Sequence, residues 1–156
     1  MDWISTLYNG NIKNDININY IDSLSQAFTH IPFDLYDYKM KISFKNHKSG
    51  FYMNWHIDDC VRIKKKQNDN FILKNKSKIF FENEKQLLLY NNKLPEYTLL
   101  YYSNVDNANG GYLIFPGLKI KPKNNMMILF PSHIPHCVTK LYSGVRKNVI
   151  IKFYKK

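Results

Sequence analysis

Cysteine is scarce in this chain. The 156 residues include two cysteines, Cys60 and Cys137, which are too few for a disulfide framework in a chain of this length. Neither cysteine has the paired spacing of a structural zinc site. The length suits one domain that buries a sizeable core. We therefore expect a single domain over residues 1–156, kept in a reducing compartment and stabilised by packing.

Long apolar runs are also missing. No stretch approaches the roughly eighteen apolar residues of a membrane span. The first five residues lack the basic and apolar segments of a signal peptide. These absences predict an intracellular, cytoplasmic protein with no membrane partner.

Arginine is rare although the chain is basic. The formal net charge is +11, and of the 23 basic residues 21 are lysine, leaving only Arg62 and Arg146. Clustered cations favour nucleic-acid binding. Here the lysines are spread along the chain, apart from Lys64–Lys66 and the C-terminus, and asparagine and isoleucine are abundant as well. Coding bias explains this composition, so nucleic acid stays open as a partner without being indicated.

Glycine and proline are few, six of each, and they divide short runs rich in isoleucine, phenylalanine and tyrosine. Residues 9–19 suit irregular structure, and helical spacing of apolar residues predicts a short helix over 20–29. The remaining pattern predicts a mainly β, jelly-roll fold of about eight strands. The expected strands are 37–45, 51–57, 79–81, 87–90, 97–103, 111–115, 126–130, 136–141 and 146–154.

The segment 60–96 does not fit this pattern. It is long, polar and rich in lysine. We interpret it as a hairpin, lid or loop inserted into a β domain that spans residues 37–154. Residues 1–36 are expected to form a helical N-terminal part that supports this domain.

A histidine and an aspartate end one predicted strand. Side chains alternate along a strand, so His56 and Asp58 share a face with Tyr52 and Asn54, while Met53 and Trp55 face outward. Asp59 points away from that face. An imidazole beside a carboxylate makes half of a metal site.

The other half lies near the C-terminus. His136 opens a predicted strand after the Pro131–Ser132 turn, and Arg146 opens the last strand ten residues later. Arg146 shares its face with Asn148, Ile150 and Lys152, so an arginine there implies a bound anion. His133 is the rival ligand, although its position suits a turn. We interpret His30 and His47 as surface or packing residues.

Taken in this order, the residues resemble the iron(II)- and 2-oxoglutarate-dependent oxygenases, most closely the prolyl 4-hydroxylase-like branch. The resemblance covers about residues 38–154. It rests on His56-x-Asp58, on His136 78 residues after that aspartate and on Arg146. The stretches 97–104 and 110–116 match two further strands of the family.

The resemblance implies a double-stranded β-helix, which is a jelly-roll variant. It also implies that His56, Asp58 and His136 form the catalytic iron site, a set that suits non-haem Fe(II). The implied cofactors are Fe(II), 2-oxoglutarate and O2, with ascorbate as an optional addition. Arg146 would bind the distal carboxylate of 2-oxoglutarate together with Tyr102. Thr98 and Tyr52 are further candidates for cofactor contact.

The implied reaction is hydroxylation of a C–H bond while 2-oxoglutarate becomes succinate and CO2. A protein or peptide side chain is the expected substrate. A nucleic-acid-modifying oxygenase is the alternative, although Lys152 stands where that branch carries a second arginine. A jelly-roll binding module with structural histidines is the third reading. Lys64–Lys66 could border the active-site mouth.

Overall fold

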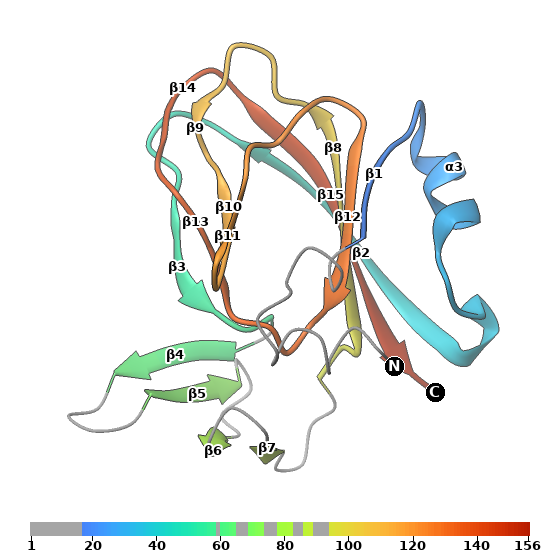
Figure 1. Cartoon of the computed structure of the whole chain (residues 1–156), viewed down its shortest axis with the longest axis vertical. Coiled ribbons are helices and arrows are strands. Elements are labelled where there is room, and N and C mark those ends of the chain that lie inside the picture. Colours follow the sequence, from blue (N-terminus) through green and yellow to red (C-terminus); the bar gives the residue numbers. More distant parts are fainter. Residues whose placement is uncertain (1–16, 59, 65–68, 74–77, 83–85, 89–93) are drawn as a thin grey trace.

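A computed structural model describes residues 17–58, 60–64, 69–73, 78–82, 86–88 and 94–156. The described part is mainly β, as predicted, with antiparallel pairing throughout (Figure 1). None of its helices is long and apolar enough to cross a membrane.

The larger sheet has five strands in the order β1-β12-β8-β15-β2. Their bounds are Asn17–Tyr20 for β1, Tyr38–His47 for β2, Tyr97–Asn104 for β8, Met126–Pro131 for β12 and Arg146–Lys155 for β15. The central strand β8 is buried from Tyr97 to Tyr102, on both faces. This double burial explains why its sequence is a continuous apolar and aromatic run.

The facing sheet has four strands in the order β11-β10-β13-β3. Their bounds are Met53–His56 for β3, Leu113–Phe115 for β10, Leu118–Ile120 for β11 and His136–Val138 for β13. A pair of short strands, β9 (Asn109–Gly110) and β14 (Leu141–Ser143), closes one end. The two main sheets pack face to face as a jelly roll.

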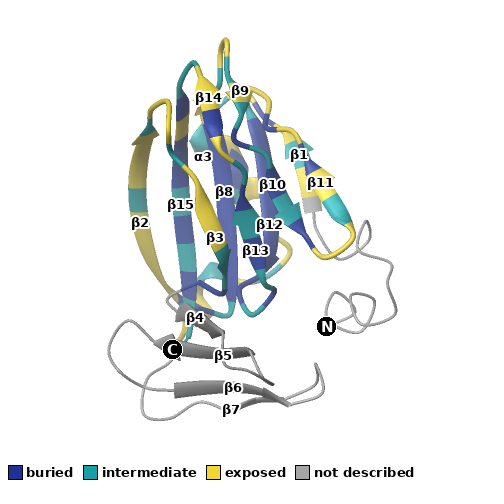
Figure 2. Cartoon of the chain, turned by 90° about the vertical axis from the view of Figure 1, so that its left-hand side faces the viewer, coloured by how far each residue is buried: buried dark blue, intermediate teal, exposed yellow. Residues whose placement is uncertain are grey.

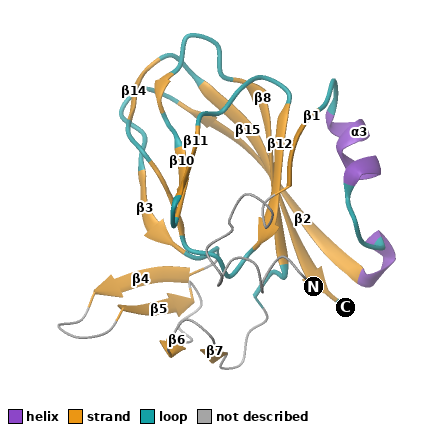
Figure 3. Cartoon of the chain, viewed as in Figure 1, coloured by secondary structure: helices purple, strands orange, loops and turns teal. Residues whose placement is uncertain are grey.

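Two apolar clusters hold these layers. One lies between the sheets and includes Leu100, Tyr102, Phe115, Ile128 and Phe130. The other covers the outer face of the larger sheet, where the N-terminal helical segment packs (Figure 3). That segment comprises α3 (Leu24–Ala27) and two 3-10 turns, η1 (Phe28–His30) and η2 (Leu35–Asp37).

The structure corrects several predicted boundaries. The expected helix over 20–29 is confined to α3 and η1, and residues expected to be irregular form β1, which pairs with β12. Strand β2 continues two residues past its predicted end at 45. The expected strand 136–141 is two strands, β13 and β14, and β11 was not predicted.

The predicted insertion contains a second β unit. Strands β4 (Cys60–Lys64), β5 (Asp69–Leu73), β6 (Lys78–Glu82) and β7 (Gln86–Leu88) form a four-stranded antiparallel meander. It follows directly from the strand that carries His56 and lies at that end of the sandwich (Figure 1). The described residues leave out residues 1–16 of the predicted N-terminal part, residues 65, 66, 89 and 90 of other predicted features, and Asp59.

Candidate active site

Three predicted ligands converge at one end of the sandwich. His56 ends β3 and His136 begins β13, and the two are directly paired across these strands. Asp58 Oδ1 lies 3.2 Å from His136 Nε2 and 3.7 Å from His56 Nε2. One ligand atom from each residue lies within 4.8 Å of the others.

Backbone contacts fix which nitrogen of each histidine faces Asp58. His56 Nδ1 lies 2.8 Å from the carbonyl oxygen of Asn54, and His136 Nδ1 lies 2.9 Å from that of Ile134. A carbonyl only accepts, so Nδ1 carries the proton and donates. In the neutral form of each ring, the Nε2 lone pair points at Asp58. Burial, together with the neighbouring His136, lowers the pKa of His56 to about 4, which favours this neutral form.

The resulting arrangement needs a cation. Two nitrogen lone pairs and a carboxylate oxygen face one another in a mostly buried space, and three acceptors repel one another without a positive charge between them. Two imidazoles and one carboxylate are the donor set of non-haem Fe(II). The residues therefore fit a metal ion of this class. Among the described residues no other group of three or more such side chains converges in this way.

Asp58 is held by two buried hydroxyl groups. Burial alone would raise the pKa of its carboxyl group, but positive charge on the His136 side, together with Lys152 and Thr98, holds that pKa below its usual range. Thr98 Oγ1 donates to Asp58 Oδ2, and Ser132 Oγ lies 2.8 Å from Thr98 Oγ1. Thr98 has one hydroxyl proton, so Ser132 must be the donor to it. Oδ1 is left to face the histidines.

Thr98 therefore contacts the metal-side carboxylate, where we had expected a cofactor contact. Ser132 was not predicted to belong to the site. The available signal in the sequence was its position directly after the apolar run of β12, because a hydroxyl group next to such a buried run needs a partner.

Arg146 forms the opposite end of the site. Its side chain is buried, with the residue 3% exposed. The guanidinium donates to Tyr102 Oη over 3.1 Å and to His47 Nδ1 over 3.1 Å. The His47 ring stacks on Phe51 with ring centroids 3.5 Å apart and 8° between the planes. Arg146 and Tyr102, which we predict to bind the same carboxylate, are therefore in contact.

The interpretation of His47 as a packing residue is incomplete, because its ring stacks on Phe51 and also contacts Arg146. Strand β2 runs two residues further than predicted, which puts His47 directly opposite Arg146. To accept from the guanidinium, His47 Nδ1 must be unprotonated. Burial lowers the pKa of His47 to about 4, and the charges of Arg146 and Lys45 act in the same direction.

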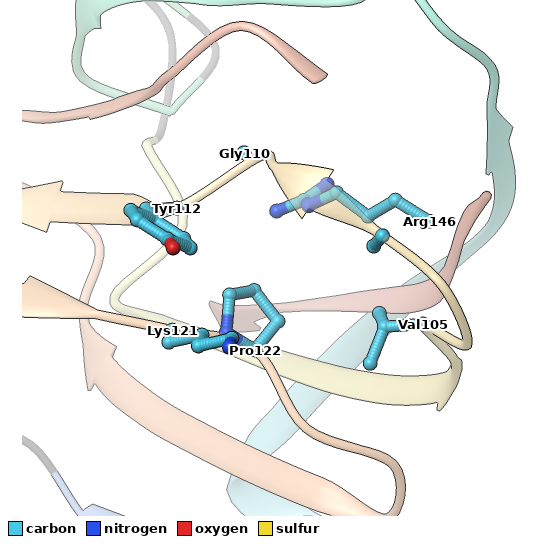
Figure 4. A pocket seen from close by; sticks show the side chains of 7 residues that line it. Val105, Gly110, Tyr112, Lys121, Pro122 and Arg146 are labelled. Atoms are coloured by element: carbon cyan, nitrogen blue, oxygen red, sulfur yellow. The ribbon is translucent and has the colours of Figure 1, made fainter. Parts of the chain in front are cut away.

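Two buried polar atoms at this end lack a hydrogen-bond partner in the described part of the chain. They are Arg146 Nε and Asn148 Oδ1. A water-sized cavity of about 10 Å³ adjoins Arg146 between Gly110, Tyr112 and Pro122 (Figure 4). Gly111 allows this close packing, because its φ is +67° and an added Cβ would lie 3.2 Å from Arg146 Cδ.

A cavity of about 220 Å³ joins the two ends. It is bordered by the triad, Thr98, Arg146 and the predicted inward face of β15, namely Asn148, Ile150 and Lys152. Strand β2 adds Lys41, Ser43 and Lys45, which were not predicted as site residues.

The predicted inward orientation of Tyr52 is wrong. Its side chain is 60% exposed and borders a groove on the outer side of β3, with Asn54, Trp55 and Cys137. The cause is a β-bulge: His136 pairs with His56 but Val138 pairs with Met53, so β3 has one extra residue there. Because one extra residue inverts the alternation, Met53 borders the cavity instead.

His133 takes no part in the triad. It lies in the turn between β12 and β13, as predicted, and its Nε2 has no hydrogen-bond partner in the part of the chain that the structure describes. Burial lowers its pKa.

Comparison with known proteins agrees with this geometry. Residues 42–155 match the model of the 2OG-Fe(II) oxygenase superfamily. No curated protein sequence is significantly similar to the chain.

Several solved structures share the fold. The viral collagen prolyl hydroxylase of Paramecium Bursaria Chlorella virus-1, in complex with 2OG, has a TM-score of 0.52 at 16% identity, covering 99% of this chain and 90% of that one. A Pseudomonas putida prolyl-4-hydroxylase has a TM-score of 0.52 at 14% identity, covering 99% and 83%. A Burkholderia pseudomallei oxidoreductase of the 2OG-Fe(II) oxygenase family has a TM-score of 0.50 at 10% identity; the match covers 76% of this chain and 44% of that one.

Proposed function

Because this chain belongs to the 2OG-Fe(II) oxygenase superfamily, we propose that it hydroxylates a C–H bond of a protein or peptide side chain, with proline as the first candidate. As a member of the family it is a 2-oxoglutarate-dependent dioxygenase whose cofactors are Fe(II), 2-oxoglutarate and O2. The proline assignment draws on the two prolyl hydroxylases that share its fold. Ascorbate stays a prediction.

One observation carries the proposal: a single cavity joins three converging metal-binding acceptors to a buried arginine. His56, Asp58 and His136 would hold Fe(II) on one side and leave its other side open to the cavity. When bound there, Fe(II) and 2-oxoglutarate supply the oxidising chemistry, in which O2 gives one atom to succinate and one to the substrate while CO2 is released. The protein supplies position, charge and exclusion of water.

Arg146 suits the distal carboxylate of 2-oxoglutarate. A guanidinium is planar and permanently charged, so it can donate two parallel hydrogen bonds to a carboxylate. Tyr102 and His47 hold the guanidinium in place by accepting from its two terminal nitrogens. The unpartnered Nε–H of Arg146 supports a ligand that accepts hydrogen bonds at this end, because buried polar atoms rarely stay unpaired.

The metal and cosubstrate requirement can be tested without knowing the substrate. Mn(II) can replace Fe(II) in binding measurements under air. We expect 2-oxoglutarate to quench tryptophan fluorescence or raise the melting temperature of the Mn(II)-loaded protein. Absence of both effects would contradict the proposal.

The substrate class needs a product measurement. Proline-containing peptides and alkylated oligonucleotides are incubated with Fe(II) and 2-oxoglutarate, with and without ascorbate. We expect mass spectrometry to detect the gain of one oxygen atom on peptides, matched by an equal amount of succinate. Repair of the oligonucleotides alone would favour the alternative of a nucleic-acid-modifying enzyme.

A further inference from the structure

The cavity opens beside an exposed row of lysines. We propose that the substrate is an acidic peptide segment, which enters in extended form along β2 and pairs its carboxylates with Lys41 and Lys45. This inference rests on the proposed peptide hydroxylation and specifies the class of peptide.

Among the residues that the structure describes, the entrance lies between two strands with a free edge. Strand β2 is the last strand of the larger sheet and β3 is the last strand of the facing sheet. Both are largely exposed, as the yellow segments in Figure 2 show. A free strand edge presents unpaired N–H and C=O groups, to which an extended peptide can add as a further strand. The cavity is bordered by residues of both strands, including Ser43 and Met53.

The lysines run along the cavity from one end to the other. In the register of β2 with β15, Lys45 is opposite Asn148, two residues from Arg146, whereas Lys41 is opposite Lys152. Lys152 marks the end nearest the metal site, because it is paired in turn with Thr98 of β8, whose hydroxyl group donates to Asp58. Lys41 and Lys45 therefore flank the path between the anion-binding end and the metal end.

These two lysines are not needed for 2-oxoglutarate. In the proposed function, Arg146 receives one carboxylate of that molecule and the metal receives the other. Arg146 is buried, whereas Lys41 and Lys45 are exposed at the rim. The acidic side chain that borders the cavity is Asp58, which belongs to the metal site. The rim thus offers positive charge to whatever enters after the cosubstrate.

The spacing of the lysines specifies the spacing of the acidic residues. Lys45 is four positions after Lys41 in the strand, which corresponds to about 13 Å along one face. An extended peptide has the same repeat, so two glutamates four residues apart present their carboxylates with the same spacing and on the same side. A proline midway between them, opposite Ser43, points to the same side and hence into the cavity.

A nucleic acid would use the lysines but not the strand edge. Phosphates pair with ammonium groups wherever these are exposed. The backbone groups of β2 find matching donors and acceptors only in another polypeptide. The position of the lysines on a free strand edge therefore favours a peptide.

The test measures binding to the full chain loaded with Mn(II) and 2-oxoglutarate, by fluorescence anisotropy. Three labelled nine-residue peptides share a central proline. The first has glutamates two residues before and two after it, the second has them two before and one after, and the third has glutamines at the first peptide's positions. We expect the first peptide to bind about tenfold more tightly than the third, the scale of two exposed ion pairs. The second should fall between them.

The variants assign the effect to the rim. In the double variant Lys41→Gln, Lys45→Gln, the preference for the first peptide should disappear, as it should when salt is raised from about 50 to about 200 mM. Lys147→Gln is the matched control, because Lys147 is an exposed lysine of β15 that does not border the cavity. Equal binding of the first and third peptides by the wild-type protein would overturn the inference, as would an equal loss in the control variant.

Three further outcomes separate this inference from the function on which it rests. If the double variant binds 2-oxoglutarate more weakly, the lysines serve the cosubstrate, and the inference fails while the proposed function stands. If a nine-nucleotide oligothymidylate binds more tightly than the first peptide, and loses affinity in the same variant, the partner is a nucleic acid. If the wild-type protein binds neither Mn(II) nor 2-oxoglutarate, the proposed function itself fails.

Discussion

The two ends of the cavity are built from opposite kinds of polar group. At the metal end, the smaller sheet contributes two histidine nitrogens, and Asp58 follows its edge strand, so three acceptors converge. At the other end, strand β15 of the larger sheet contributes Arg146, which is a donor only. One end therefore selects a cation and the other an anion.

The supporting residues differ in the same way. At the metal end the support is a donor: Thr98 donates to the distal oxygen of Asp58 and is itself fixed by Ser132. At the arginine end the supports are acceptors, Tyr102 and His47. A donor thus holds the acceptor at the metal end, and acceptors hold the donor at the arginine end. The cavity suits a molecule that chelates a metal at one end and carries a carboxylate at the other.

The largest effect is expected from removing a metal ligand. His136→Ala removes one of three converging acceptors, and we expect Mn(II) binding and 2-oxoglutarate turnover to fall to background. Isothermal titration with Mn(II) and measurement of succinate check this.

His133→Ala is the matched control, since His133 is a buried histidine three residues away that lies outside the triad. The His133→Ala protein should bind Mn(II) as the wild type does, even if its free energy of unfolding falls. The reverse result would show that the wrong histidine was assigned to the metal end.

The arginine end should respond differently from the metal end. Arg146→Gln leaves the anion without its charged partner, and loss of one member of such a buried pair costs about 2–5 kcal/mol. We expect the affinity for 2-oxoglutarate to fall about a hundredfold or more, while Mn(II) affinity changes little. Arg146→Lys should give an intermediate loss, because lysine keeps the charge without the bidentate geometry. Equal loss of Mn(II) binding in both variants would mean that the two ends are not separate.

Thr98 tests the support at the metal end alone. Thr98→Val keeps the shape and removes the hydroxyl group that holds Asp58. Loss of a hydrogen bond that orients a ligand typically lowers metal affinity about 10- to 100-fold. We expect this loss in Mn(II) titrations of Thr98→Val, and we expect Thr98→Ser to bind Mn(II) as the wild type does. The free energy of unfolding of the metal-free Thr98→Val protein should fall by no more than about 1–2 kcal/mol. If Thr98→Ser also bound Mn(II) weakly, the methyl group of Thr98, and not its hydroxyl group, would be what supports metal binding.

The sequence predicted which side chains meet at the cavity better than it predicted the residues that support them. His56, Asp58, His136 and Arg146 could be found because a strand places alternate side chains on one face and because a charged group on an apolar strand requires a partner. The structure brings these side chains to one cavity. The jelly-roll fold followed from the short β-prone runs between turns.

What the sequence missed depends on pairing between distant strands. Tyr52 was predicted to face inward, but a β-bulge opposite His136 inverts the alternation upstream of His56, and nothing local in β3 marks it. The role of His47 depends on its register with Arg146, 99 residues away. Short strands such as β11 are also specified by their partners, because three residues carry too little pattern to predict.

The smallest effect is expected at His47, and it depends on pH. The folded protein lowers the pKa of His47 from 6.5 to about 4, so the neutral form is favoured and its contribution to stability is present above about pH 6.5. This contribution is lost as the pH falls from about 6.5 towards 4, because the unfolded chain takes up a proton first. His47→Gln keeps an acceptor for Arg146 that does not titrate.

We therefore expect the melting temperature of the metal-free protein to fall less steeply in His47→Gln than in the wild type over that pH range. Solvent screens the half-exposed ring, so the difference should be about 1 kcal/mol or less, which is about 2–4 °C. His56 also has a lowered pKa, so some pH dependence should remain in the variant. Identical slopes would mean that His47 does not accept from Arg146, and the arginine end would then have Tyr102 as its acceptor.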